Sequence, residues 1–340
     1  MDTETILKKG LTMRKLGLWI VCLGIALGVL ACAKKQPATG PANKGPKKLK
    51  IAVIPKGTTH VFWKSVEAGA KKAGAELGVE IVWKGPLKES DRADQIKLVE
   101  QFVAEGIDGI VLAPLDSEAL ARPVLNAMQK KIPVVIFDSA LKGEPGKDFV
   151  SFVATNNRKG GSMAGEQLAK LLGDKGKVVL LRYAVGSAST EEREAGFLET
   201  LKTKPDMTML VDNRYGGATV GESKNEAMKL IDKLKEADGV FCPNESSTLG
   251  MLGALRDNNL AGKTTFIGFD ATPPLVEALE KGEIKALIAQ DPTRMGYEGV
   301  KTLVAHIKGE KVPPVVDTGV RLITPENLND PEIKKFLGRE

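Results

Sequence analysis

The chain has 340 residues, of which 42% are hydrophobic and 5% aromatic, and its formal net charge is +6. This length exceeds one typical domain. Residues 1–50 hold ten Lys and Arg against two acids, so the rest of the chain carries about −2. The body therefore has no basic excess of the kind that binds nucleic acid, and we expect no nucleic-acid partner.

The start of the chain predicts a secretory signal. Arg14 and Lys15 precede an apolar stretch, Leu16 to Leu30, that is too short to be read as a membrane span. The stretch ends in Val29-Leu30-Ala31-Cys32, which resembles the bacterial lipobox. We expect residues 1–31 to be a lipoprotein signal peptide and Cys32 to be lipidated. The alternative is an ordinary cleaved signal followed by a chance cysteine.

Residues 32–48 mix lysines with proline and glycine, a composition typical of a flexible linker. Its lysines would add weak attraction to an anionic lipid surface. Cys22 lies in the predicted signal, so only Cys242 remains in the body, and a disulfide framework is excluded there.

From Leu49 onward, short apolar runs alternate with longer amphipathic ones. The runs are bounded by Gly, Pro, Asp or Asn and predict buried strands. They are Ile51–Ile54, Ile81–Trp83, Gly109–Leu112, Val134–Phe137, Phe149–Ala154, Val178–Leu181, Met209–Val211, Gly239–Phe241, Thr265–Phe269 and Ala286–Ala289. The segments between them have helical periodicity. We therefore expect an α/β fold of two similar doubly wound domains with parallel sheets.

Open α/β sheets bind ligands at the carboxyl ends of their strands. The residues that follow the predicted strands are rich in carboxylates, amides and hydroxyls, and aromatic residues lie close by. Flat rings beside paired hydrogen-bonding groups suit a sugar, which has C–H faces and an equator of hydroxyls. The strand ends therefore predict a sugar site.

At these positions the chain resembles the periplasmic ribose/galactose-type sugar-binding proteins, the receptors of ABC sugar importers. The motifs that carry the resemblance are His60-Val61-Phe62-Trp63, Pro133 to Asp138, Gly186 to Thr190 with Arg193, Asn244 after Val240-Phe241, Ile267 to Asp270, and Ile288-Ala289-Gln290. It implies two domains, residues 49–155 plus 291–318 and residues 156–290 plus 319–340. They would be joined by a three-segment hinge around a ligand cleft.

The resemblance also implies roles for individual residues. Asp138 and Asp270 would accept bonds from sugar hydroxyls, Arg193 would donate to sugar oxygens, and Asn244 and Gln290 would do both. Phe62, Trp63 and Phe269 would stack on the sugar, with Tyr215 near the other aromatic wall. We add His60, Ser139 and Thr155 to the expected site. His60 replaces the Asn, and Ser139 the Arg, of the ribose receptor, so the identity of the sugar stays open.

The resemblance implies a monomeric, lipid-anchored receptor in the periplasm or on the exterior of the cell envelope, which delivers a pentose or hexose to an ABC permease. A polyol, a furanosyl signal molecule or a nucleoside is the alternative ligand, and chemotaxis or sensing the alternative role. A transcription regulator of the same fold is disfavoured because the first 50 residues read as a signal and linker. Catalysis is disfavoured because no hydrolase or metalloprotease motif occurs. We expect no cofactor and no metal.

Overall fold

The computed structural model describes residues 48–338. The predicted signal peptide, Cys32 and the linker up to residue 47 lie outside the described residues. Within residues 48–338, no helix combines the length and the hydropathy that crossing a bilayer requires.

The first lobe is built on a six-stranded sheet in the order β11-β5-β4-β3-β1-β2, and all neighbouring strands are parallel. Its strands are β1 (Lys50–Ile54), β2 (Glu80–Trp83), β3 (Gly109–Leu112), β4 (Val134–Phe137), β5 (Ser151–Ala154) and β11 (Val315–Asp317). Its helices are α1 (Val61–Leu77), α2 (Arg92–Glu105), α3 (Ala121–Gln129) and α10 (Pro292–Ile307).

The second lobe has a sheet in the order β12-β10-β9-β8-β6-β7. Its strands are β6 (Lys175–Arg182), β7 (Asp206–Tyr215), β8 (Gly239–Phe241), β9 (Thr265–Phe269), β10 (Ala286–Gln290) and β12 (Val320–Ile323). Its helices are α4 (Asn157–Leu172), α5 (Ala188–Lys202), α6 (Val220–Lys229), α7 (Ile231–Glu236), α8 (Glu245–Asp257), α9 (Pro273–Glu280) and α11 (Pro331–Phe336).

The two sheets have the same strand order, so β4 in one lobe corresponds to β9 in the other. This confirms the predicted pair of similar doubly wound domains. One detail of the prediction is wrong, because β12 pairs antiparallel with β10. The chain reaches β12 directly from β11 through a turn at Gly319, whose φ of 89° is in the left-handed region that favours glycine. Because β11 is parallel to β5 and ends at the carboxyl edge of the first sheet, the chain enters the second sheet at its carboxyl edge and runs opposite to β10.

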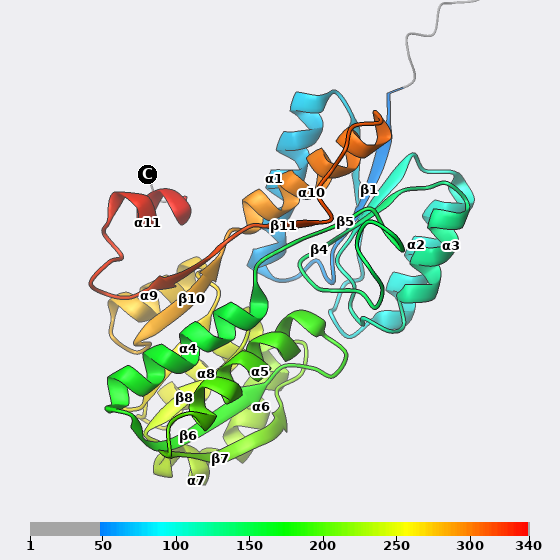
Figure 1. Cartoon of the computed structure of the whole chain (residues 1–340). Helices are drawn as coiled ribbons and strands as arrows, with labels where there is room; N and C mark the ends of the chain where they lie inside the picture. The colour runs from blue at the N-terminus through cyan, green and yellow to red at the C-terminus, as the bar shows by residue number, and fades with distance from the viewer. Residues whose placement is uncertain (1–47, 339–340) are drawn as a thin grey trace, which may run out of the picture. The chain divides into compact units, whose positions relative to one another are not determined.

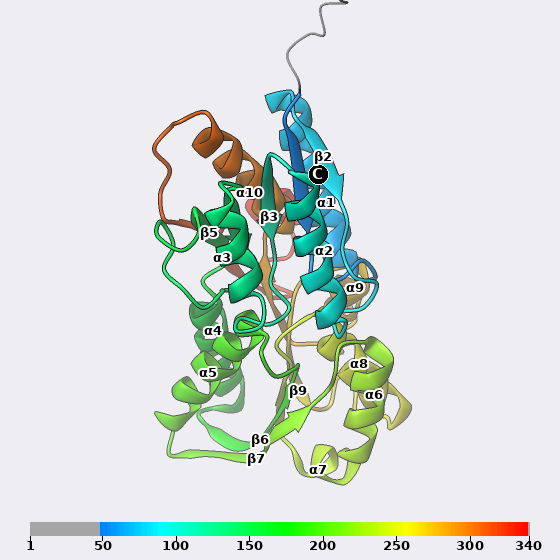
Figure 2. The same cartoon turned by 90° about the vertical axis from the view of Figure 1, so that its right-hand side faces the viewer.

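The sheets are covered on both faces, as the apolar runs predict. In β1, Ile51 and Val53 contribute to one core, and Ala52 and Ile54 contribute to the other. Successive strand side chains point to opposite faces, so a strand buried on both faces is apolar throughout. Figures 1 and 2 show α1 with α10 on one face of the first sheet, and α2 with α3 on the other.

Two glycines bring helix backbones into close contact at equivalent places in the two lobes. A Cβ atom at Gly69 of α1 would lie 1.9 Å from the carbonyl oxygen of Thr293, and one at Gly161 of α4 would lie 1.9 Å from that of Arg193. Only glycine permits such an approach. The contacts pack α1 on α10 and α4 on α5.

The chain passes between the sheets three times, after β5, after β10 and between β11 and β12. The helices that follow the first two passages, α4 and α10, are capped alike. Asn156 accepts a bond from Lys159 N at 3.0 Å, and Asp291 accepts one from Arg294 N at 2.8 Å. The domain boundaries predicted from the sequence fall in these three segments. Their exact positions stay a prediction.

Candidate ligand-binding site

A small cavity of about 30 Å³ lies where the carboxyl ends of the two sheets face each other. Both lobes contribute to its wall, and most of the side chains are polar or charged. The lining residues are Lys56, His60, Phe62, Trp63, Glu89, Asp138, Tyr183, Ser189, Thr190, Arg193, Asn244, Glu245, Asp270 and Gln290.

Two aspartates occupy corresponding positions in the two lobes. Asp138 follows β4 and Asp270 follows β9, and their φ angles of 62° and 72° both lie in the left-handed region. A non-glycine residue rarely adopts this conformation, and residues that do so cluster at functional sites. Asp270 Oδ1 accepts a bond from Gln290 Nε2 at 2.7 Å, and Asp138 Oδ2 lies 3.4 Å from Lys56 Nζ. Burial raises the pKa of Asp270, while the charge of Arg193 opposes that rise.

Arg193 is held in place by three hydrogen bonds within the second lobe. Its guanidinium donates to Asn157 Oδ1 at 2.8 Å, to the Pro243 carbonyl at 2.9 Å and to Gln290 Oε1 at 2.9 Å. Its Cζ atom lies 3.8 Å from the ring centroid of Phe269, so the guanidinium covers that ring. Burial lowers the pKa of Arg193, and the nearby carboxylates of Asp270 and Asp138 oppose the fall.

Glu89 is the centre of a hydrogen-bond cluster. Its Oε1 accepts from Trp63 Nε1 at 2.6 Å and lies 2.7 Å from His60 Nδ1, and its Oε2 accepts from Tyr183 Oη at 2.7 Å. Burial alone would lower the pKa of His60, but the bond to Glu89 and its charge raise that pKa to about 9. Burial alone would raise the pKa of Glu89, but the same partner lowers it to about 2. The two side chains therefore form an ion pair at neutral pH.

Direct bonds join the lobes around this cavity. Glu245 of the second lobe accepts from the backbone N–H groups of Val61 at 3.3 Å and Phe62 at 3.0 Å, and so caps α1 of the first lobe. Lys56 of the first lobe donates to the hydroxyls of Ser187 at 3.1 Å and Ser189 at 2.9 Å. The structure is therefore the closed form of the two lobes.

The first lobe supplies an aromatic wall. The rings of Phe62 and Trp63 meet edge to face with centroids 4.9 Å apart, and Trp63 packs edge to face against Phe137 at 6.1 Å. These contacts fix the orientation of both rings at the start of α1.

Eight of the residues expected from the sequence line the cavity: His60, Phe62, Trp63, Asp138, Arg193, Asn244, Asp270 and Gln290. The structure does not bring the other four there. Phe269 is fully buried in the core beneath Arg193, because strand alternation turns it inward where Asp270 turns out. Tyr215 is 42% exposed at the end of the edge strand β7. Ser139 accepts a bond from Ser189 N, and Thr155 donates to the Gly319 carbonyl at a crossing.

Six lining residues were not selected from the sequence: Lys56, Glu89, Tyr183, Ser189, Thr190 and Glu245. Three of them follow strands closely, so the rule that ligands bind at strand ends could have found them. Glu89 lies six residues beyond β2, in a loop without a recognisable motif, and only the fold brings it inward.

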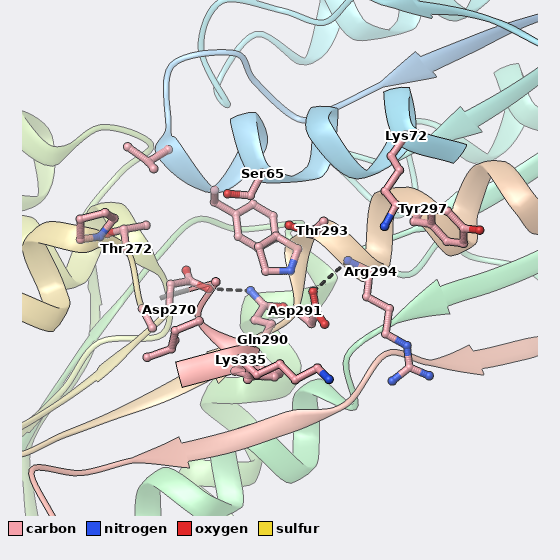
Figure 3. Close-up of a pocket in the computed structure, with 18 residues that line it drawn as sticks. Ser65, Lys72, Asp270, Thr272, Gln290, Asp291, Thr293, Arg294, Tyr297 and Lys335 are labelled. Atoms are coloured by element: carbon pink, nitrogen blue, oxygen red, sulfur yellow. Dashed lines mark hydrogen bonds between the residues drawn. The ribbon is translucent and has the colours of Figure 1, made fainter. Parts of the chain in front are cut away.

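A larger cavity, of about 630 Å³, lies beside the second crossing. Figure 3 shows that Asp270 and Gln290, joined by their hydrogen bond, form part of its wall, with Asp291 and Lys335 nearby. Asp270, Gln290 and Phe62 thus line both cavities.

The sequence matches the family described as periplasmic binding protein domain over residues 51–311. A ribose import binding protein of Salmonella typhimurium is 31% identical over 300 residues, which cover 87% of this chain and 97% of that protein. The relatives of this kind are transport proteins and not enzymes, in agreement with the sequence-based expectation.

Solved structures of sugar-binding proteins are similar to this chain over most of its length. A carbohydrate transporter solute-binding protein of Agrobacterium radiobacter, in complex with D-arabinose, is 36% identical with a TM-score of 0.82. The match covers 86% of this chain and 99% of that one. An ABC transporter solute-binding protein of Agrobacterium vitis with bound D-fucose is 33% identical with a TM-score of 0.81, covering 84% and 98% of the two chains.

Proposed function

The chain belongs to the periplasmic binding protein family, and from this premise we propose that it binds a monosaccharide, a pentose or a hexose, between its two lobes. The observation that carries the proposal is the interlobe cavity, where carboxylates, amides and a guanidinium from both lobes meet two aromatic rings. Similar proteins bind ribose, D-arabinose and D-fucose, as their names state, which supports this ligand class.

The size of the cavity dictates how the ligand would enter. About 30 Å³ leaves room for little more than a water molecule. A sugar therefore requires the lobes to separate and some side chains to exchange their present partners for hydroxyls. Lys56, Asp138 and Gln290 are suited to this exchange, because each is now bonded to a protein group that a hydroxyl can replace.

A bound sugar would favour the closed state, because residues of both lobes contact it. His60, Asp138 and the aromatic wall would bind from the first lobe. Arg193, Asn244, Asp270 and Gln290 would bind from the second. Ser139 and Thr155 would act indirectly, through Ser189 and the hinge.

We also propose that Cys32 carries a lipid anchor and that the monomeric receptor delivers its sugar to an ABC permease. Family membership supports a location in the periplasm or the cell envelope. A receptor tethered through residues 32–48 would remain close to its transporter. A polyol or nucleoside is the second candidate ligand, because both present hydroxyls and an apolar surface to the same walls.

The experiment that tests the ligand class is mass spectrometry of small molecules that copurify with the protein. We expect a pentose or hexose. Thermal denaturation against a panel of sugars follows, since a ligand that binds only the native state raises the midpoint. A folded sample whose midpoint responds to a nucleoside or polyol and to no monosaccharide would contradict the proposal.

A further inference from the structure

Glu89 occupies an unusual position for a loop residue. It lies between β2 and α2, yet its side chain is only 6% exposed and lines the interlobe cavity. Gly57 provides the room, because a Cβ atom there would lie 2.8 Å from Glu89 Cγ. The φ of Gly57 is not in the left-handed region, so the close approach of Glu89 is what requires glycine.

The bonds of Glu89 connect three parts of the site. Trp63 is held by its ring nitrogen, so the orientation of this aromatic wall depends on Glu89. His60 is held as its ion-pair partner. Tyr183 belongs to the second lobe, and its hydroxyl is the only one of these groups that reaches Glu89 across the cleft.

The acceptor capacity of Glu89 is not exhausted. A carboxylate has about four acceptor positions, two on each oxygen. Trp63 and His60 use both positions on Oε1, and Tyr183 uses one on Oε2. One position on Oε2 is left, on a side chain that lines the cavity, and only a hydrogen-bond donor can use it.

We infer that Glu89 is a specificity-determining residue, which accepts a bond from a ligand hydroxyl on the first-lobe side while its bond to Tyr183 closes the second lobe over that ligand. The inference rests on the proposed monosaccharide function. It identifies the ligand class more closely: the ligand presents a donor to Glu89, and a carboxylate or phosphate group at that place is rejected by charge.

The surrounding charges agree with this assignment. Lys56 and His60 are the cations whose charges lower the pKa of Glu89. Burial and the carboxylates of Glu89, Asp138 and Glu222 raise the pKa of Tyr183. The charge of Glu245, in the second lobe, raises the pKa of His60. In the wall as a whole, Glu89, Asp138, Glu245 and Asp270 outnumber the cations Lys56, His60 and Arg193. No excess positive charge is present that would attract an anionic sugar.

Two isosteric variants separate the parts of the inference. Glu89→Gln removes the charge, and Tyr183→Phe removes only the bond across the cleft. We expect each to weaken binding of a neutral monosaccharide about tenfold or more in a calorimetric titration of the purified protein. Glu118→Gln, an exposed residue on the first lobe that pairs with Lys142, is the matched control and should bind as the parent does.

The titration of His60, followed by the NMR signals of its ring, tests the ion pair with Glu89, and the preference between a neutral sugar and its acid is the readout that a merely structural role of Glu89 would not move. Glu89→Gln should lower the pKa of His60, because burial then acts without its counterion, whereas Tyr183→Phe should leave it unchanged. Calorimetry with the matching sugar acid completes the test. Glu89→Gln should improve binding of the acid relative to the neutral sugar at least tenfold.

The outcomes are distinguishable. Parental affinity and an unchanged acid-to-neutral ratio in a folded Glu89→Gln variant would overturn the inference and leave the proposed function intact. No binding of any monosaccharide by the parent protein would overturn the proposed function, and the inference with it. If Glu89→Gln does not fold, Gly57→Ala displaces the same carboxylate without removing its charge, and parental affinity in that variant would also overturn the inference.

Discussion

Asp138 and Asp270 are equivalent residues of the two lobes, each directly after the third strand in the order of its sheet and each with a positive φ. Both aspartates line one cavity, each from its own lobe. The internal similarity of the lobes thus brings two strained aspartates to the same cavity, one from each lobe.

Replacing either aspartate by asparagine should weaken monosaccharide binding about 10- to 100-fold. A carboxylate can accept hydroxyl bonds at both oxygens, whereas an amide accepts at its oxygen only and donates at its nitrogen. Asparagine tolerates a positive φ, so the backbone should not change. Asp174→Asn is the control, since Asp174 also has a positive φ of 60° but is exposed and remote from the cavity. Titration calorimetry measures all three variants, and equal losses in all of them would argue for a backbone effect.

Arg193→Lys should lower both affinity and stability. An ammonium group cannot reach three separate acceptors while lying flat on Phe269, so buried acceptors lose their donors. We expect the free energy of unfolding to fall by about 2 kcal/mol, measured by urea denaturation. Arg158→Lys, at an exposed arginine paired with Glu192, should not change stability measurably. Comparable losses in the two variants would contradict the role of Arg193.

The ion pair of His60 and Glu89 should make the free energy of unfolding fall as the pH becomes alkaline. The pKa of His60 is raised to about 9 in the folded protein, so its contribution is complete below the ordinary value of 6.5 and is lost as pH rises through 9. The difference corresponds to about 3 kcal/mol. Urea denaturation between pH 6 and pH 10 measures the loss.

The control for this pH dependence is His60→Gln. Burial also raises the pKa of Tyr183 and of Cys242, so these groups reduce stability at high pH in any variant. The contribution of His60 is therefore the difference between the parent and His60→Gln, which should shrink as pH rises from 6.5 to 9. A constant difference over that range would mean that His60 is not held charged by Glu89.

Cys32→Ser tests the proposed anchor. The substituted full-length protein should move from the membrane fraction to the soluble fraction, because serine cannot be lipidated. Its sugar affinity should equal that of the parent, since the interlobe cavity is formed by residues 56–290. Fractionation followed by immunoblotting, with calorimetry on the released protein, measures both. Retention in the membrane fraction would contradict lipidation at Cys32.

The sequence predicted ten strands that the described structure contains, and missed β11 and β12. These two are short and partly exposed, with Val315 56% exposed, so they lack the apolar run that identifies a buried strand. They also lie on either side of the third crossing. Their pairing there depends on how the chain passes from one lobe to the other and not on the local pattern of apolar residues.

The sequence indicated a place at the cavity wall for residues at the carboxyl ends of inner strands, and Asp138, Asn244, Asp270 and Gln290 do line the cavity. Phe269 does not line it, because strand alternation directs the ring into the core. Glu89 could not be found because its loop enters the cavity only through the close approach at Gly57. Such a contact between distant segments leaves no periodic or spacing signal in the sequence.

The central claim is that one monosaccharide binds between the lobes. Isothermal titration of the purified protein with a panel of D-pentoses and D-hexoses tests it most directly. We predict saturable binding of at least one of them with one site per chain, and a loss of affinity of at least tenfold in Asp270→Asn. Absence of heat with every pentose and hexose, in a sample shown to be folded and free of bound ligand, would contradict the account.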